Sequence, residues 1–116
     1  MIETTSLSNK FDTLLLISID ETLNYVLGEI NAAIIYRYLE AKDCTKEELP
    51  QKLEFFSLTL RDLIGNGRRQ MLGAASVLEA TIAETFAKKL ETSFDETLPI
   101  NFPEYIRQLK QKYLNK

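Results

Sequence analysis

The stretch Ile64-Gly65-Asn66-Gly67 separates two long segments that both show helical periodicity. Apolar residues recur three or four positions apart on either side, upstream at Leu53, Phe56, Leu60, Leu63 and Ile64, and downstream at Met71, Ala75, Leu78, Ile82, Phe86 and Leu90. This spacing puts apolar side chains on one face of a helix, and glycine readily adopts the positive φ that ends one. The pattern predicts two helices folded back on each other at residue 65.

The rest of the chain extends this pattern into an all-α fold, a compact single-domain bundle of about five helices. We expect a flexible N-terminus over residues 1–9 and a helical domain over residues 10–116, with helices at 10–27, 29–41, 50–64, 67–91 and 103–115. Ser8 or Asn9 is expected to cap the first helix. Thr45 and Glu48 fit a capping box, which predicts a short turn near residues 45–49. Two prolines predict a non-helical strap near residues 92–103.

The helix at residues 10–27 is apolar around much of its circumference, so we expect it to be the central one. Its predicted buried face consists of Phe11, Leu15, Ile19, Leu23, Val26 and Leu27. Gly28 follows, and Glu29 suits the first turn of a new helix, which favours a break over a kink. On the helix at residues 29–41 we expect Ile30, Ala33, Ile34 and Leu39 to face inward, with Tyr36 and Tyr38 beside them.

The composition excludes several chemistries. The 116-residue chain contains no histidine and has one cysteine, Cys44, in a polar connection that favours an incidental surface thiol. We expect no metal, no cofactor and no enzymatic activity, because the carboxylates form no persuasive pair and solvated faces account for Glu79 and Glu84. No apolar run approaches the ~18 residues that span a bilayer, and no signal peptide is present, so a cytoplasmic protein without membrane contact is expected.

One candidate anion site follows the central turn and comprises Gly65, Asn66, Gly67, Arg68 and Arg69. Free backbone amides at a helix N-terminus, followed by two arginines, are the ingredients of a phosphate site. The segment lacks the Gly-Lys-Ser/Thr ending of a phosphate loop and follows a helix instead of a strand. A tight turn with two solvated arginines is therefore the favoured interpretation.

A second set of candidates could bind a protein partner: Tyr36, Tyr38, Tyr105, Tyr113, Arg107 and Lys110. Tyrosine and arginine are common at interface hot spots, although rim positions around a helical core explain the tyrosines about equally well. Residues 104–116 have a local charge of +3 in a chain of net charge −3, which suits an acidic partner or a solvated last helix. The helix at residues 67–91 could form a dimer seam, but a place in the core is favoured.

The order of these signals resembles the Nitrosopumilus output domain family, small helical domains of ammonia-oxidising and related archaea. The matching elements cover about residues 11–90 and are Phe11-Asp12-Thr13-Leu14-Leu15, Ser18-Ile19-Asp20, Leu27-Gly28-Glu29, Tyr36, Leu39, Glu48-Leu49-Pro50, Phe55 or Phe56 with Leu60, and Ile64-Gly65-Asn66-Gly67. The resemblance implies a helical output or interaction module of prokaryotic signalling, with no catalytic residues to carry over. Because the domain is nearly the whole chain, a stand-alone partner-binding protein is the more natural expectation.

These observations favour a non-enzymatic interaction or regulatory module, an adaptor or signalling output protein that dimerises or binds another protein. The first alternative is a nucleic-acid-associated regulator that contacts phosphates through Arg68, Arg69 and the basic last helix, although the net charge of −3 disfavours it. The second is a small-ligand sensor with an apolar pocket beside the helix at residues 10–27.

Overall fold

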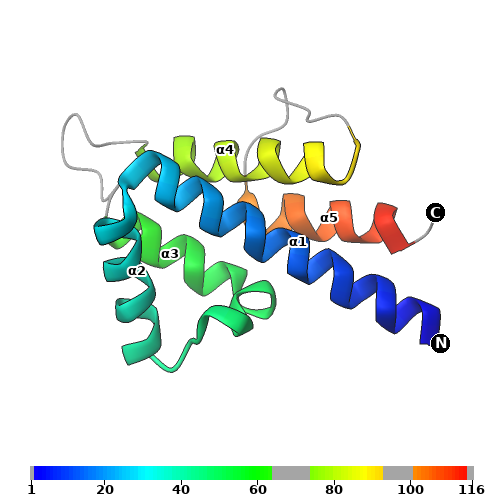
Figure 1. Ribbon diagram of the computed structural model, residues 1–116, viewed down its shortest axis with the longest axis horizontal. Coiled ribbons are helices and arrows are strands. Elements are labelled where there is room, and N and C mark those ends of the chain that lie inside the picture. Colours follow the sequence, from blue (N-terminus) through cyan, green and yellow to red (C-terminus); the bar gives the residue numbers. More distant parts are fainter. Residues whose placement is uncertain (1, 64–73, 93–100, 115–116) are drawn as a thin grey trace.

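The computed structural model describes residues 2–63, 74–92 and 101–114. Its elements are α1 (Ile2–Leu27), α2 (Glu29–Ala41), the 3₁₀ helix η1 (Lys46–Gln51), α3 (Leu53–Leu63), α4 (Ala74–Lys89) and α5 (Phe102–Leu114). The described residues contain no strand, which confirms a single compact all-α domain. Figure 1 shows α1 crossing the middle of the domain, with α4 along one side and α2 and α3 on the other. No helix in these ranges has the length and apolar character to cross a membrane.

Helix α1 is the central helix, as its sequence predicts. One face buries Phe11, Leu15, Ile19 and Leu23 almost completely, and α1 contacts α2, η1, α4 and α5. The prediction was wrong for Val26, which is 52% exposed at the end of α1 where no described helix covers it fully, and Leu27 is only partly buried. Helix α4 fills the core from the opposite side with Ala75, Leu78, Ile82, Ala83, Phe86 and Ala87, so its apolar face belongs to the core. Its small residues let α1 and α4 pack closely, because small side chains shorten the distance between helix axes.

Several helix boundaries differ from the prediction. Helix α1 begins at Ile2 instead of residue 10, so Ser8 and Asn9 lie inside the helix and do not cap it. The sequence of residues 2–9 contains neither proline nor glycine, so nothing in it forces a helix to end. The expected flexibility of residues 1–9 stays a prediction. Helix α5 begins at Phe102, one residue earlier than expected, and Asn101 caps it by accepting a hydrogen bond from the Glu104 amide at 3.1 Å.

The helix predicted from Pro50 is split in the structure. The predicted capping box is present, with the Thr45 amide donating to Glu48 Oε1 at 2.9 Å, but the turn that it starts continues as η1 through Pro50. Lys52 leaves helical geometry at φ −131°, and α3 begins only at Leu53. The capping box starts a tight 3₁₀ turn that takes in Pro50, so the α-helix predicted from that residue begins only after the turn has ended.

The ends of α4 lie close to the edges of the described ranges. Its last helical residue is Lys89, two residues before the predicted end, and Glu91 adopts φ 60° in the turn that follows. Its predicted start at residue 67, the glycine turn and most of the strap at residues 92–103 lie outside the described residues.

Gly28 breaks the helical stretch instead of kinking it. Its φ of 88° lies in the left-handed region that favours glycine, and it separates α1 from α2. Helix α2 ends without a glycine, because Asp43 takes this role at φ 65° and the Cys44 amide donates to the Leu39 carbonyl at 2.9 Å. This Schellman ending turns the residue after Asp43 inward. Cys44 is therefore buried, against the expectation of a surface thiol, and burial raises the pKa of its thiol.

Candidate functional site

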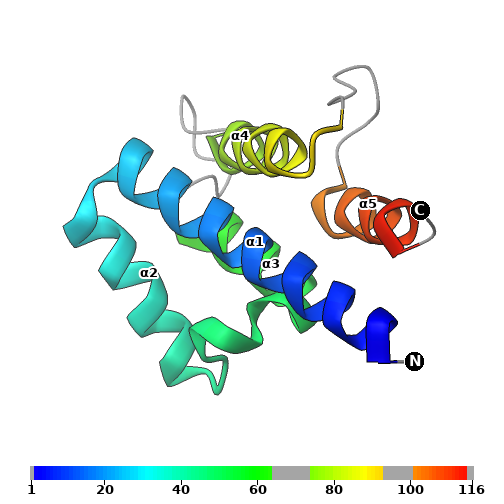
Figure 2. The same ribbon diagram turned by 45° about the vertical axis from the view of Figure 1, so that its right-hand side comes forward.

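The outer face of helix α2 is the strongest candidate interaction surface. The structure buries Ala32, Ile35 and Leu39, whereas Ile30 is 78% exposed and Ile34 is 49% exposed. Figures 1 and 2 both show α2 at one edge of the domain, with the other helices on one side of it only. We define the α2 face as Ile30, Ala33, Ile34, Arg37 and Ala41, which are exposed and recur at helical spacing.

The sequence prediction for α2 was wrong for Ile30, Ala33 and Ile34 and right for Leu39. Both faces of this helix are apolar at steps of three and four, so periodicity alone does not choose between them. Gly28 sets the rotation of α2 relative to α1, and that rotation turns Ile35 inward and Ile34 outward. The outward face of α2 thus carries apolar surface that the domain itself does not cover.

Two exposed charges lie on or beside the α2 face. Glu29 stands in the first turn of α2 and borders the face, and Arg37, a member of the face, lies eight residues later. Both side chains are exposed, and neither forms an ion pair within the described residues. An exposed apolar stripe with unpaired charges on or beside it matches the usual anatomy of a protein interface, an apolar centre with a polar rim.

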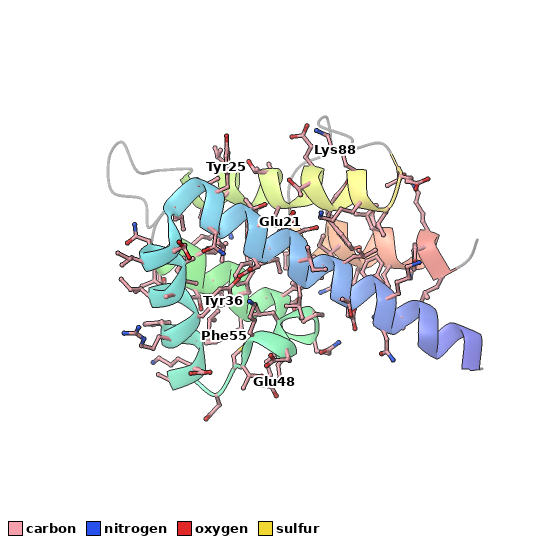
Figure 3. All side chains as sticks on the ribbon, in the orientation of Figure 1. Glu21, Tyr25, Tyr36, Glu48, Phe55 and Lys88 are labelled. Atoms are coloured by element: carbon pink, nitrogen blue, oxygen red, sulfur yellow. The ribbon has the colours of Figure 1, made fainter. Side chains whose placement is uncertain are left out.

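A polar network fixes the inner side of α2. The Tyr36 hydroxyl donates to Asp20 Oδ1 of α1 at 2.9 Å, and Lys46 Nζ of η1 donates to the same oxygen at 3.0 Å while lying 4.8 Å from the Tyr36 ring centre. Figure 3 shows Tyr36 on the inner side of α2, toward α1 and α3. Burial, together with the Asp20 carboxylate, raises the pKa of Tyr36. Burial also acts to raise the pKa of Asp20, but the bonds from Lys46 and Tyr36 outweigh it and the pKa is lowered.

The predicted partner-binding residues do not form one surface. Tyr36 and Tyr38 lie on α2, whereas Tyr105, Arg107, Lys110 and Tyr113 lie on α5, and Figures 1 and 2 show these helices at opposite ends of the domain. The predicted anion site at residues 65–69 lies outside the described residues.

Most of these side chains form ion pairs or packing contacts with other residues of the domain. Arg107 pairs with Glu54 at 2.9 Å and Glu104 at 2.6 Å. Lys110 Nζ lies 3.5 Å from Asp12, and Tyr113 packs on Phe11 with ring centres 5.6 Å apart. Tyr105 is half-buried against the core, and Lys42 lies 5.7 Å from the Tyr38 ring. These contacts favour structural roles at the rim of the core.

A buried ionic cluster between α3 and α4 was missed in the sequence. Glu79, predicted to be solvated, is fully buried. One carboxylate oxygen lies 3.0 Å from Arg61 Nη2, and the other accepts from Arg61 Nη1 at 3.1 Å and from the Ser57 hydroxyl. The signal was present, because Glu79 falls four residues after Ala75 and three before Ile82 on the apolar face of α4.

This cluster borders a hollow of about 410 Å³ lined by Glu54, Ser57, Leu58, Arg61, Asn101, Phe102 and Pro103. A serine beside a carboxylate is the start of a nucleophile arrangement, but the imidazole that usually takes the serine proton has no counterpart in a chain without histidine. Arg61 instead joins α3 to α4 by holding the buried carboxylate of Glu79. The cluster is best explained as a structural ion pair.

Neither the metal-binding side chains of the described residues nor a comparison with known proteins points to a second site. Among the described residues, no group of three or more cysteine, aspartate or glutamate side chains could hold a metal ion. Comparison of the chain with protein-family models, curated proteins and solved structures finds no match.

Proposed function

We propose that this protein is a non-enzymatic helical interaction module whose α2 face binds a protein partner. The exposed pair Ile30 and Ile34, four residues apart on the same face of α2, is the observation that carries the proposal. Leaving these aliphatic side chains in water forgoes the stabilisation that burial would give, on the order of 2 kcal/mol for Ile30 and about 1 kcal/mol for Ile34, which is already half-buried. A partner that covers the α2 face would recover it.

The wider setting follows from the sequence. A cytoplasmic location is the expectation from the sequence, and the resemblance to the Nitrosopumilus output domain family implies an output role in archaeal signalling. Both suit a domain with a packed core and an uncovered face on α2. Such a module acts by presenting a surface, so it needs no catalytic group. The network of Asp20, Tyr36 and Lys46 supports this role because it holds α2 in one rotation.

The two alternatives gain less support. In the nucleic-acid hypothesis the basic last helix contacts phosphates, but Arg107 and Lys110 already pair with carboxylates of the same domain. In the ligand-sensor hypothesis an apolar pocket lies beside α1, but the described residues that line the hollow of about 610 Å³ bordering α1 include no leucine, isoleucine, valine or phenylalanine; they are Glu21, Thr22, Asn24, Tyr25, Thr81 and Thr85.

Site-specific cross-linking tests the proposal. A photoreactive side chain in place of Ile34 is expected to capture a protein in native cells, whereas the same side chain in place of Leu58 is not. Leu58 is the matched control because it is 60% exposed on α3, away from the α2 face. Equal capture at both positions, or none at either, would contradict the proposal.

A further inference from the structure

Resting on the proposed function, we infer that the partner of the α2 face is a second copy of this chain. The two copies pair through antiparallel α2 helices across a two-fold axis near Ala33 and Ile34. Three features of α2 support this geometry: the size of its side chains, the position of its charges and the length of the exposed stripe.

The side chains of the α2 face suit the close approach of an identical helix. Ile34 lies at the middle of the stripe, and Ala33 stands beside it. An antiparallel two-fold axis at this point keeps each flank of the stripe on the same side in both copies, so Ile34 meets Ile34 of the partner subunit and Ala33 meets Ala33 of the partner subunit. The small alanines let the two helices approach to the usual 8–10 Å between axes, with the isoleucines covering each other beside them. Because the same patch serves both copies, the contact closes as a dimer.

The charges favour the antiparallel orientation. By helical periodicity, Arg37 lies within the stripe, four residues after Ala33 and three after Ile34, and Glu29 lies beside the stripe on the flank where Ala33 stands. The two charges are roughly 12 Å apart along the helix at 1.5 Å per residue. The two-fold axis lies midway between them, so it brings Arg37 of each copy beside Glu29 of the partner subunit. A parallel pairing would place Arg37 beside Arg37 of the partner subunit and leave both charges unpaired. Neither charge has a partner within the described part of its own chain, so both are free to pair across the axis.

The length of the exposed stripe determines how tightly the two copies are expected to bind. Helix α2 has 13 residues, so the contact is roughly 20 Å long. A single-helix contact of this length is smaller than the roughly 800 Å² per partner of a typical stable complex. The dimer is therefore expected to dissociate on dilution, with a dissociation constant on the order of micromolar.

The inference is tested by solution mass over a hundredfold range of concentration. The wild type is expected to rise from 13.3 kDa toward twice that mass. Ile34→Ser is expected to weaken the dimer at least tenfold, whereas the control Leu58→Ser leaves it unchanged.

Charge reversal tests the antiparallel register. Arg37→Glu alone and Glu29→Arg alone each put like charges together and are expected to weaken the dimer about tenfold. Mixed in equal amounts, these two variants are expected to form a dimer with each other, because every contact between them is then complementary. Circular dichroism checks that each variant keeps its helix.

Each outcome separates the inference from the proposed function. A wild type that stays at 13.3 kDa throughout overturns the second copy as partner. Capture of a different protein from Ile34 would then leave the interaction module standing, whereas no capture would remove both. If Ile34→Ser weakens the dimer but the mixture of Arg37→Glu and Glu29→Arg forms none, the antiparallel two-fold arrangement is overturned.

Discussion

Two ion pairs of the same length hold this domain together in different ways. Arg61 and Glu79 lie 3.0 Å apart between α3 and α4, and Lys46 and Asp20 lie 3.0 Å apart between η1 and α1. The Glu79 side chain is fully buried, whereas 38% of the Asp20 side chain is exposed. Distance alone would rank the two pairs as equals.

Solvent makes them unequal. Removing one partner of a buried pair strands the other charge in a medium that solvates it poorly, whereas an exposed group regains water. The buried pair is therefore costly to break without being a large net source of stability. The comparison separates two quantities, the cost of breaking a contact and the net contribution of having it.

The largest effect is expected from Arg61→Met. This change leaves the Glu79 carboxylate buried without its cation, and we expect a loss of about 3 kcal/mol in the free energy of unfolding, measured by urea denaturation. The double variant Arg61→Met with Glu79→Leu is expected to lose less than Arg61→Met alone, because no charge is then stranded. A single-variant loss below about 1 kcal/mol would place this pair with the exposed ones.

Glu79→Gln is expected to have a smaller effect, a loss of about 1–2 kcal/mol. Glutamine keeps the volume of the side chain and an oxygen that accepts from Ser57, but it removes the charge and replaces the oxygen that faces Arg61 Nη2 with an amide donor. Arg61 then loses its counter-charge, but 38% of its side chain is exposed and water can solvate the guanidinium. Chemical denaturation beside Arg61→Met checks the order, and a larger loss for Glu79→Gln would contradict it.

The buried pair also shows where sequence reading reached its limit. The faces of α1 and α4 were predicted correctly except for Val26 of α1, which is 52% exposed, because most of the apolar residues spaced three or four apart pack into the core. The prediction was wrong for Glu79 because a carboxylate is expected to face solvent. Only the packing of α3 on α4 brings Arg61 close enough to pair with it. Periodicity describes one helix, whereas a buried charge depends on what a second helix supplies.

The candidate site on α2 was harder to predict for a related reason. Its two faces are both apolar, and the rotation that chooses between them is set at Gly28, outside the helix. Ile30 and Ile34 were therefore assigned to the core. The prediction was wrong for Cys44 because the Schellman ending at Asp43 turns Cys44 inward. That ending contains no glycine, the residue by which a sequence usually indicates such an ending.

The contribution of the partly exposed Lys46–Asp20 pair to the free energy of unfolding is expected to depend on pH. The Asp20→Asn variant should lose about 0.5–1 kcal/mol at neutral pH, a small amount because the side chain is partly solvated. The pKa of Asp20 is lower in the folded protein than its ordinary value of 3.8, so its contribution is present above that value and is lost as the pH falls below it. Unfolding curves of both proteins should therefore converge in acid. Curves that stay equally separated below pH 3.8 would contradict this assignment.

The smallest effect is expected at the pair of Arg107 with Glu54, where both side chains are more than half exposed. Arg107→Met should change the free energy of unfolding by less than about 0.5 kcal/mol, because both charges are solvated with or without the contact. Thermal unfolding at low and high salt checks this, since screening should remove even that difference. A loss as large as that of Arg61→Met would mean that charge, and not the burial of Phe102, Ile106 and Leu109, holds α5 against the domain.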